Sequence, residues 1–145
     1  MPNLITNKKA GRDYAILERF EVGVVLTGSE VKSLRAGKGV LTGSHVVVRS
    51  GEVYILGMQI PSYQPANDKN VLDPARTRKA LLTKKEIYTL ADYDSKKGYT
   101  IIPLSVFTKG KKIKMEIAVV RGKKKYDKRA DLKKRDDQRY MQRHA

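Results

Sequence analysis

The clearest hydrophobic pattern in the chain runs over residues 112–120, where apolar and polar positions alternate. Side chains of a β-strand point alternately to its two faces, so this pattern predicts a strand with one buried face. The apolar run 100–108 predicts a second strand. Residues 109–111 predict the hairpin turn between the two, because Gly110 can adopt a positive φ. Pro103 has no backbone N–H and is expected at an edge or a bulge.

Two more pairs of strands are predicted earlier in the chain. Residues 45–49 and 52–58 flank Ser50 and Gly51, a two-residue loop of the kind that joins antiparallel strands. Residues 13–20 and 22–26 form the other predicted pair. The sequence therefore predicts about six short antiparallel strands.

Two helices are predicted from the signals at their ends. Ser29 is a candidate N-cap for a short helix that runs to Ala36, with Gly37 as a left-handed stop. Thr83, with Glu86 three residues later, forms the capping-box pattern that begins a longer helix. Residues 73–79 begin with Asp-Pro and predict a further helical turn.

These elements together predict the fold class. Alternating strands around one core, with helices over the open ends, are typical of a small closed barrel, and the OB-like barrel is the leading form. We therefore expect a mainly β protein with about six antiparallel strands and two or three short helices, followed by a basic C-terminal tail.

Positive charge limits the classes of partner. The 145 residues include 31 Lys and Arg against 15 Asp and Glu, a formal net charge of +16. Such an excess favours a polyanionic partner: nucleic acid, an anionic membrane surface or an acidic protein. No apolar run approaches the roughly 20 residues that span a bilayer, no signal-peptide pattern begins the sequence, and cysteine is absent. We expect a cytoplasmic protein without a membrane anchor.

Residues 122–145 differ from the rest in composition. They hold ten Lys and Arg, four Asp and few apolar residues, for a net charge of +6. So little apolar surface cannot offset the entropy of ordering, so we expect this tail to be disordered in the free protein. Asp131 and Arg135, like Lys133 and Asp137, are opposite charges at helical i,i+4 spacing, which favours helix once a partner neutralises the tail. The chain thus divides into a barrel, 1–121, and a tail, 122–145.

Catalytic and metal-binding chemistry find little support. The chain has two histidines, His45 in a predicted strand and His144 beside the C-terminus. A Ser–His–Asp triad built on His45 stays open, but an isolated histidine on a strand is the simpler interpretation. Asp92 and Asp94 resemble the start of a calcium loop, but lysines follow where further ligands belong. We expect no catalytic residue, cofactor or metal.

The basic residues of the body cluster at helices and loops. One cluster lies on and just after the first predicted helix and consists of Lys32, Arg35 and Lys38. The other lies before and at the start of the longer predicted helix and consists of Arg76, Arg78, Lys79, Lys84 and Lys85. Residues 1–121 carry a net charge of +10, so these clusters are candidate nucleic-acid contacts. No recognition helix for a DNA major groove is evident, and a barrel with exposed aromatic residues suits unpaired nucleotides.

Longer strings around these clusters resemble a known family. The most specific are residues 26–38 (LTGSEVKSLRAGK), 73–79 (DPARTRK) and 121–129 (RGKKKYDKR), supported by 7–10 (NKKA), 13–14 (DY), 20–23 (FEVG) and 81–82 (LL). In this order and spacing they resemble small protein B (SmpB), the SsrA or transfer-messenger RNA-binding family of bacteria. The chain departs from the family pattern at Gly11, Gly39 and Val40.

The resemblance implies an OB-type barrel that binds the tRNA-like domain of transfer-messenger RNA and is not an enzyme. Protein and RNA would enter the A site of a stalled ribosome, where the protein stands in for the anticodon arm and the RNA directs tagging of the unfinished polypeptide (trans-translation). Expected partners are therefore transfer-messenger RNA, the small-subunit decoding centre and mRNA channel, and elongation factor Tu through the RNA. We expect a monomer whose tail is helical when bound to the ribosome.

By position, the resemblance implies two sets of site residues. RNA contacts of the body are expected at Asn7, Glu21, Lys32, Arg35, Arg78 and Leu81. Decoding-centre contacts of the tail are expected at Gly122, Lys123, Lys124, Tyr126, Asp127, Lys128 and Arg129. For Glu21, three roles stay open: accepting hydrogen bonds from RNA, orienting a lysine, or forming a salt bridge at the barrel end. Leu81 could belong to the core or to the contact surface.

Two other functions stay open. A ribosomal or ribosome-assembly protein with an OB barrel and a basic tail fits the composition equally well, and the three strings are what favour the first interpretation. A nucleic-acid enzyme such as a nuclease is the other alternative, which incubation with magnesium and labelled RNA would test.

Overall fold

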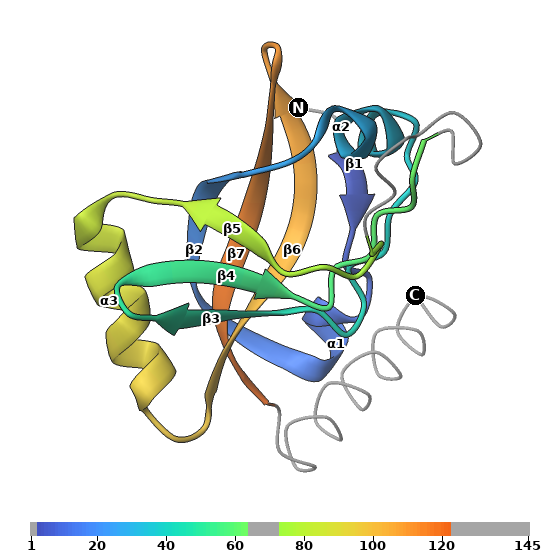
Figure 1. Ribbon diagram of the computed structural model, residues 1–145. Coiled ribbons are helices and arrows are strands. Elements are labelled where there is room, and N and C mark those ends of the chain that lie inside the picture. The colour runs from blue at the N-terminus through green and yellow to red at the C-terminus, as the bar shows by residue number, and fades with distance from the viewer. Residues whose placement is uncertain (1–2, 64–72, 123–145) are drawn as a thin grey trace, which may run out of the picture.

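Three long strands form the centre of the fold in the computed structural model, which describes residues 3–63 and 73–122 (Figure 1). They are β2 (Tyr14–Val24), β6 (Tyr99–Lys109) and β7 (Lys112–Gly122), and β7 pairs antiparallel with both others. The β6–β7 hairpin turns at Gly110, whose φ of +62° confirms the predicted turn. The register shifts between Pro103 and Ser105, so the predicted bulge is also confirmed.

Four shorter strands complete the sheet, and three of them close it into a barrel. They are β1 (Asn3–Thr6), β3 (His45–Arg49), β4 (Glu52–Leu56) and β5 (Arg78–Leu81). The strand order is β1-β6-β3-β4-β5-β2-β7, and the additional β6–β7 pairing closes six of the strands into a ring with β1 outside it. Ser50 and Gly51 join β3 to β4 with φ values of +52° and +74°, as their sequence predicts. The described residues thus form the predicted mainly β, OB-like fold, with seven antiparallel strands of which six close the barrel.

Strand β2 corrects one prediction. Residues 13–26 were expected to form a hairpin that turns near Glu21, but Tyr14–Val24 is a single strand. It pairs with β7 from Tyr14↔Gly122 to Gly23↔Lys114. Phe20 and Val22 are both buried, on either side of Glu21. Side chains therefore keep alternating between the core and the surface through Glu21, and the strand does not turn there.

Strand β5 corrects a second prediction. Residues 73–79 were expected to be helical, but only a turn at Asp73 is present, where the Ala75 amide donates to Asp73 Oδ1 (2.9 Å). Arg78–Leu81 then pairs with β4 and β2. An arginine occupies an inward-facing position of this strand. It interrupts the alternation of apolar and polar residues from which the strand could have been predicted.

The helices follow their local signals with one shift. Helix α2 spans Gly28–Arg35 and is capped by Thr27 rather than Ser29, because the Glu30 side chain completes a capping box with Thr27. Gly37 follows with a φ of +76°, as predicted for a left-handed stop. Helix α3 (Lys84–Ser95) has the predicted capping box of Thr83 and Glu86. A four-residue helix, α1 (Ala10–Asp13), was not predicted.

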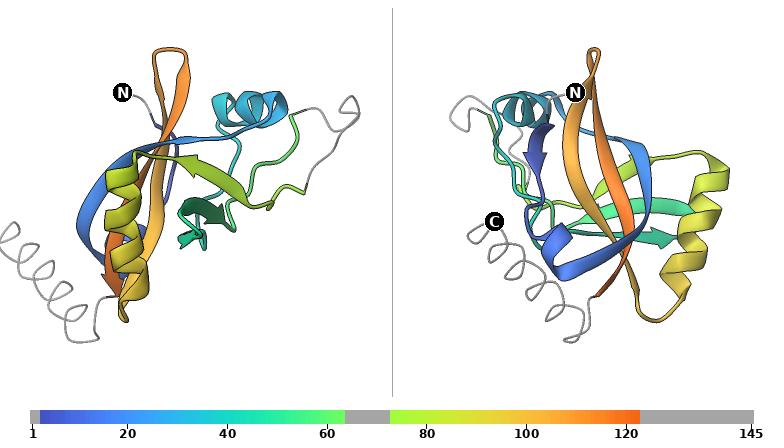
Figure 2. Two further views of the ribbon diagram at one scale, coloured as in Figure 1. Left: turned by 60° about the vertical axis from the view of Figure 1, so that its left-hand side comes forward. Right: turned by 180° about the vertical axis from the view of Figure 1, so that it is seen from behind.

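The core has two parts. The main part fills the barrel and takes in Leu34 of α2 and Leu90 of α3, helices that lie on opposite sides of the barrel (Figure 2). A smaller cluster packs Ala10 of α1 against Ile102 and Val120. Strand β6 therefore buries side chains on both faces, which explains why its sequence is a continuous apolar run rather than an alternating one.

Candidate nucleic-acid interface

Helix α2 presents two cations at one end of the barrel. Lys32 and Arg35 lie three residues apart, share one face of the helix and are exposed. With Ala36 and Tyr63 they line a shallow cavity of about 490 Å³. Arg35 Nη2 donates to the backbone carbonyl of Lys111 (2.9 Å), which joins α2 to the turn of the β6–β7 hairpin. Both elements lie at the same end of the molecule (Figure 1).

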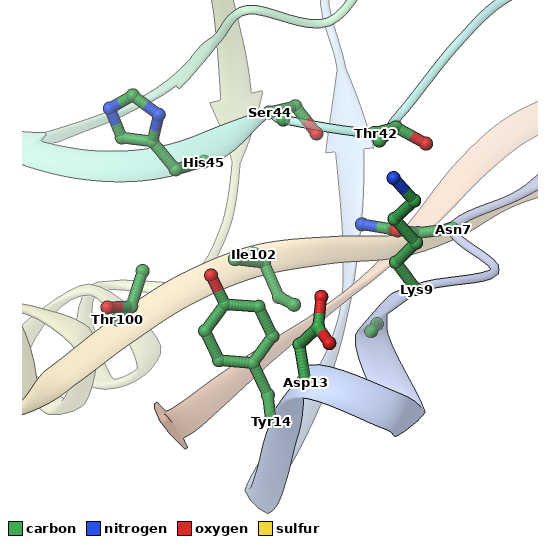
Figure 3. Close-up of a pocket in the computed structure, with 11 residues that line it drawn as sticks. Asn7, Lys9, Asp13, Tyr14, Thr42, Ser44, His45, Thr100 and Ile102 are labelled. Atoms are coloured by element: carbon green, nitrogen blue, oxygen red, sulfur yellow. The ribbon is translucent and has the colours of Figure 1, made fainter. Parts of the chain in front are cut away.

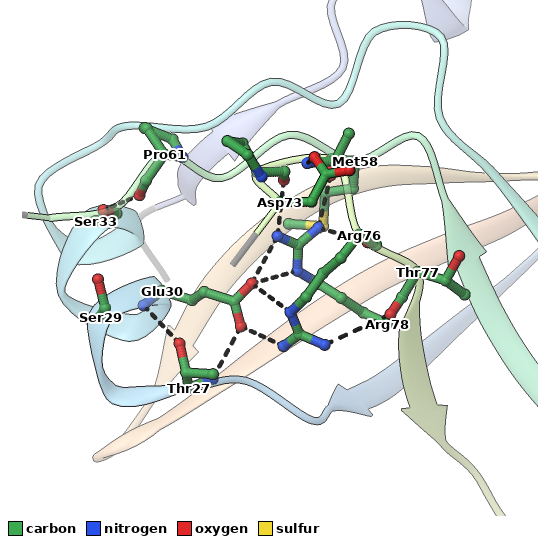
Figure 4. A network of polar contacts seen from close by, with 12 residues as sticks. Thr27, Ser29, Glu30, Ser33, Met58, Pro61, Asp73, Arg76, Thr77 and Arg78 are labelled. Atoms are coloured by element: carbon green, nitrogen blue, oxygen red, sulfur yellow. Dashed lines mark hydrogen bonds and ion pairs between the residues drawn. The ribbon is translucent and has the colours of Figure 1, made fainter. Parts of the chain in front are cut away.

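A buried ion network fixes α2 against β5 (Figure 4). The Glu30 side chain, 7% exposed, accepts from Arg78 Nε (2.7 Å) and forms ion pairs with Arg78 and Arg76. The Arg78 side chain is fully buried, and its other N–H groups donate to backbone carbonyls that include those of Met58 (2.6 Å) and Pro74 (2.9 Å). This burial leaves Arg78 no exposed donor for RNA, and its guanidinium instead holds the helix that carries Lys32 and Arg35.

The network changes the titration of its carboxylate. Burial by itself raises the pKa of Glu30, but the hydrogen bonds from Arg76, from the Thr27 amide and from Arg78 outweigh it, so that the pKa lies below its ordinary value. Burial also lowers the pKa of the Arg78 guanidinium, and the hydrogen bond and charge of Glu30 oppose that change. The ionised pair is therefore the form that the fold stabilises.

Acid should weaken this network. Because the pKa of Glu30 is lower in the folded protein than in the unfolded chain, its contribution to stability is present above the unfolded value and is lost as the pH falls through the folded value. We expect the thermal midpoint to fall as the pH is lowered below about 4.3, the ordinary value for glutamate. In the Glu30→Gln variant, the same acidification should lower the thermal midpoint by a smaller amount. Parallel pH profiles for the two proteins would show that another carboxylate is responsible.

Leu81 lies on the surface. Its side chain is 53% exposed at the end of β5, which favours the contact surface over the core. It lines a groove of about 390 Å³ together with parts of β2, α2 and residues 111–114 of the β6–β7 hairpin. Three of these hairpin residues are lysines.

Glu21 takes part in a surface ion pair. Its carboxylate lies 3.1 Å from Lys109 Nζ, and both side chains are about half exposed. Of the three roles considered for Glu21, the structure shows the salt bridge at the barrel end. Exposed pairs of this kind contribute about 0–1 kcal/mol, so an RNA donor can compete with the lysine at little cost.

Four of the predicted body residues therefore gather around one element. Arg35 contacts Lys111, Glu21 contacts Lys109, and Leu81 shares a groove with residues 111–114. Lys32 lies beside Arg35 on α2. We call this region the hairpin surface, defined by Glu21, Lys32, Arg35, Leu81 and residues 109–114.

Asn7 lies in a different region. Its Nδ2 donates to the Pro103 carbonyl (3.0 Å), so the side chain ties the segment after β1 to the bulge in β6. Asn7 also lines a cavity of about 410 Å³, in which Lys9 and Tyr14 extend from one wall toward the segment that holds His45 (Figure 3). Gly122 pairs with Tyr14 and so lies at this end of β7, away from the hairpin turn.

One residue of the predicted tail site ends strand β7. Gly122 is the last described residue and is exposed. The other predicted decoding-centre residues lie outside the described residues: Lys123, Lys124, Tyr126, Asp127, Lys128 and Arg129.

Some residues of this region are not singled out by the sequence patterns. Glu30 falls within the predicted short helix, and Lys111, Lys112 and Lys114 fall within the predicted turn and strand. Four lysines within residues 109–114 would have marked the hairpin as a basic cluster. No comparable signal marks Tyr63, which reaches α2 through its backbone N–H on Ser29 Oγ (3.0 Å).

The part of the chain that the structure describes offers no group of three or more His, Asp or Glu side chains that could hold a metal ion. Across residues 3–63 and 73–122, no helix is long and apolar enough to span a membrane. His45 is exposed, at the edge of the cavity that Asn7 lines.

Comparison with known proteins supports the resemblance. An SsrA-binding protein of Acetivibrio thermocellus is 48% identical over 137 residues, covering 94% of this chain and 88% of the relative. An SsrA-binding protein of a Sulfurihydrogenibium species is 50% identical over 137 residues, 94% of this chain and 90% of the relative. A solved structure described as "tmRNA-SmpB: a journey to the center of the bacterial ribosome" matches with a TM-score of 0.71 and 37% identity, over 88% of this chain and 93% of that chain.

The family itself is identified by its sequence model. The family described as "SmpB protein" matches residues 4–145, nearly the full length of the sequence. The match includes all the strings that first suggested the resemblance. With this family match, with relatives near 50% identity and with the shared barrel, the chain belongs to the SmpB protein family.

Proposed function

We propose that this protein binds the tRNA-like domain of transfer-messenger RNA and delivers it to the A site of stalled ribosomes. The observation that carries the proposal is the hairpin surface, where α2 and the β6–β7 turn gather Lys32, Arg35 and residues 109–114 beside the exposed Leu81. Cations bind phosphates and an apolar side chain contacts bases, so this combination suits a folded RNA with unpaired nucleotides.

The relatives support the choice of RNA. They are described as SsrA-binding proteins, and the solved structure pairs an SmpB protein with tmRNA and the bacterial ribosome. We propose that this chain acts in the same setting, in the cytoplasm and as a binding protein rather than an enzyme. Within it, the barrel binds the RNA, residues 122–145 contact the decoding centre and the mRNA channel, and elongation factor Tu is engaged through the RNA.

A direct comparison of RNAs tests this function. The full-length protein should bind the tRNA-like domain of transfer-messenger RNA at least tenfold more tightly than fragments of ribosomal RNA of equal length at the same salt concentration. Salt must be fixed because phosphate contacts alone give affinity without specificity. Equal affinity for both RNAs would instead favour a general ribosomal or assembly protein.

Arg35→Ala should weaken binding of the tRNA-like domain by about 1 kcal/mol or more, because a guanidinium on phosphate or on a base edge forms a charge-assisted hydrogen bond. The thermal midpoint should hardly change, since Arg35 is exposed and, among residues 3–63 and 73–122, its side chain donates a single hydrogen bond, to the Lys111 carbonyl. Binding titration and thermal unfolding of the same samples measure the two effects.

Arg49→Ala is the matched control for this substitution, because Arg49 is an exposed arginine on β3 outside the hairpin surface. It should leave the affinity nearly unchanged. A large fall in the thermal midpoint of Arg35→Ala with unchanged affinity would make Arg35 a structural residue.

A further inference from the structure

Helix α1 and the start of β2 place three polar side chains in one cavity. Lys9, Asp13 and Tyr14 all point toward the segment that leads into β3 (Figure 3). Lys9 and Asp13 stand at i,i+4 spacing and so lie on the same side of α1. The cavity has a volume of about 410 Å³, within the range of about 300–1,000 Å³ that is usual for small-ligand sites.

The two charged side chains of this cavity are available to a ligand. In the part of the chain that the structure describes, no ion pair uses the Lys9 ammonium or the Asp13 carboxylate. The side chains of Asn7 and Ser44, which also line the cavity, each donate to a backbone carbonyl. Asp13 is half-buried, so a ligand that donates hydrogen bonds would replace the hydration that its carboxylate has lost.

The floor of the cavity is apolar and belongs to the core. Ala10 and Ile102 are each 3% exposed and lie in the smaller core cluster, against which Tyr14 packs. A flat ring can pack against Ile102 and the face of Tyr14 without moving either side chain. An apolar floor with a few converging polar groups is the usual construction of a small-ligand site.

The signs of the two charges select the class of ligand. The Asp13 carboxylate repels a phosphate, so a ligand with neutral donors and acceptors fits better. Guanine presents a ring N–H and an amino group side by side, which match the two oxygens of a carboxylate, and beside them a carbonyl oxygen, which matches an ammonium. The pairing edges of adenine, cytosine and uracil lack two adjacent donors.

We propose that this cavity is a guanine-binding site. Asp13 accepts hydrogen bonds from the ring N–H and the amino group, Lys9 donates to the carbonyl oxygen, and the base packs against Ile102 and Tyr14. The site is separate from the hairpin surface, because Tyr14 pairs with Gly122 at the opposite end of β7 from the hairpin turn. The inference therefore goes beyond the proposed function and adds a ligand that the hairpin surface does not bind.

Titration of the full-length protein with the four nucleoside monophosphates tests the choice of base. The backbone amide NMR signals of Thr100 and Ile102 should shift with guanosine monophosphate at concentrations about tenfold lower than with the other three. Lys9→Ala should weaken this binding. Lys8→Ala should not, because Lys8 is an exposed lysine that does not line the cavity. Equal binding of all four nucleotides would overturn the proposal.

Asp13→Asn provides a test that a loss of folding cannot imitate. The amide keeps one acceptor and gains a donor, so the variant should bind guanosine monophosphate about tenfold more weakly than the wild-type protein does. It should bind xanthosine monophosphate more tightly, because xanthine has a carbonyl in place of the amino group. Asp92→Asn, at an exposed aspartate on α3, is the matched control and should change neither affinity. If Asp13→Asn behaves like this control, Asp13 does not contact guanine.

The guanine can come from a free nucleotide or from an RNA chain, and one comparison separates the two sources. A short single-stranded RNA with one guanosine should be compared with guanosine monophosphate in the Arg35→Ala variant, whose hairpin surface is weakened. Tighter binding of the RNA would mean that Lys8 and Arg12, exposed beside the cavity, contact its phosphates. Equal binding would identify the free nucleotide as the ligand, and either result supports the site. The affinity for the tRNA-like domain tests the proposed function independently.

Discussion

Glu30→Ala should lower the free energy of unfolding by about 3–5 kcal/mol, because removing one partner of a buried ion pair leaves the other charge uncompensated. The Arg78 side chain is fully buried and Glu30 is its ion-pair partner, while Arg76, also paired with Glu30, is partly exposed. The loss should be measured by denaturant unfolding at neutral pH. RNA affinity should fall as well, since the capping box that begins α2 loses its glutamate.

Two control variants identify the cause of this loss. Glu116→Ala removes a carboxylate whose partner, Arg19, is 59% exposed, and it should cost much less because exposed pairs contribute about 0–1 kcal/mol. Adding Arg78→Met to Glu30→Ala should recover part of the stability, because the stranded charge is then absent. If Glu30→Ala unfolds at the same denaturant concentration as the wild-type protein, the network does not stabilise the fold.

Removal of residues 123–145 should abolish tagging of polypeptides on stalled ribosomes while it changes the affinity for the tRNA-like domain by less than tenfold, about 1.4 kcal/mol. The barrel needs none of these residues to close, since β7 ends at Gly122 and pairs along its length with β2 and β6. The hairpin surface also lies entirely within the retained chain. A tagging assay on ribosomes stalled without a stop codon and an RNA titration at physiological salt measure the two activities.

The charge of the removed segment needs its own control. Residues 123–145 contribute +6 to the net charge, so their loss alone weakens any phosphate contact. A variant that keeps the composition of this segment in shuffled order retains the charge. It should bind RNA like the wild-type protein and fail in tagging. Normal tagging by the shuffled variant would mean that charge is sufficient, and a tenfold or greater loss of RNA affinity on truncation would contradict the division between body and tail.

Short-range chemistry explains what could be predicted of the fold from sequence. The turns at Ser50-Gly51 and Gly110 and the capping box of Thr83 and Glu86 are each set by residues within a few positions of one another. The alternation of apolar and polar residues in β7 is equally local, because successive side chains of a strand point to opposite faces whatever packs against them. The mainly β architecture followed from these signals.

Long-range contacts explain the errors. Arg78 occupies an inward position of β5, where an arginine argues against a strand unless a buried partner compensates its charge. That partner is Glu30, 48 residues earlier. Strand β2 passes through Glu21 because β7 pairs with it from Tyr14 to Gly23. The two partners at Glu21↔Glu116 are 95 residues apart, beyond the reach of any local pattern.

The candidate site also has features that the sequence predicted and features that depend on the tertiary structure. The residue types at the interface, and the family resemblance that named them, were evident from the sequence alone. The tertiary structure decided that Lys32, Arg35, Leu81 and Glu21 meet around one hairpin, that Asn7 lies elsewhere, and that Arg78 faces inward. The physical reason is that closing a barrel brings together the ends of strands that are far apart in the chain. Whether a side chain is buried or exposed then depends on which distant residues pack against it.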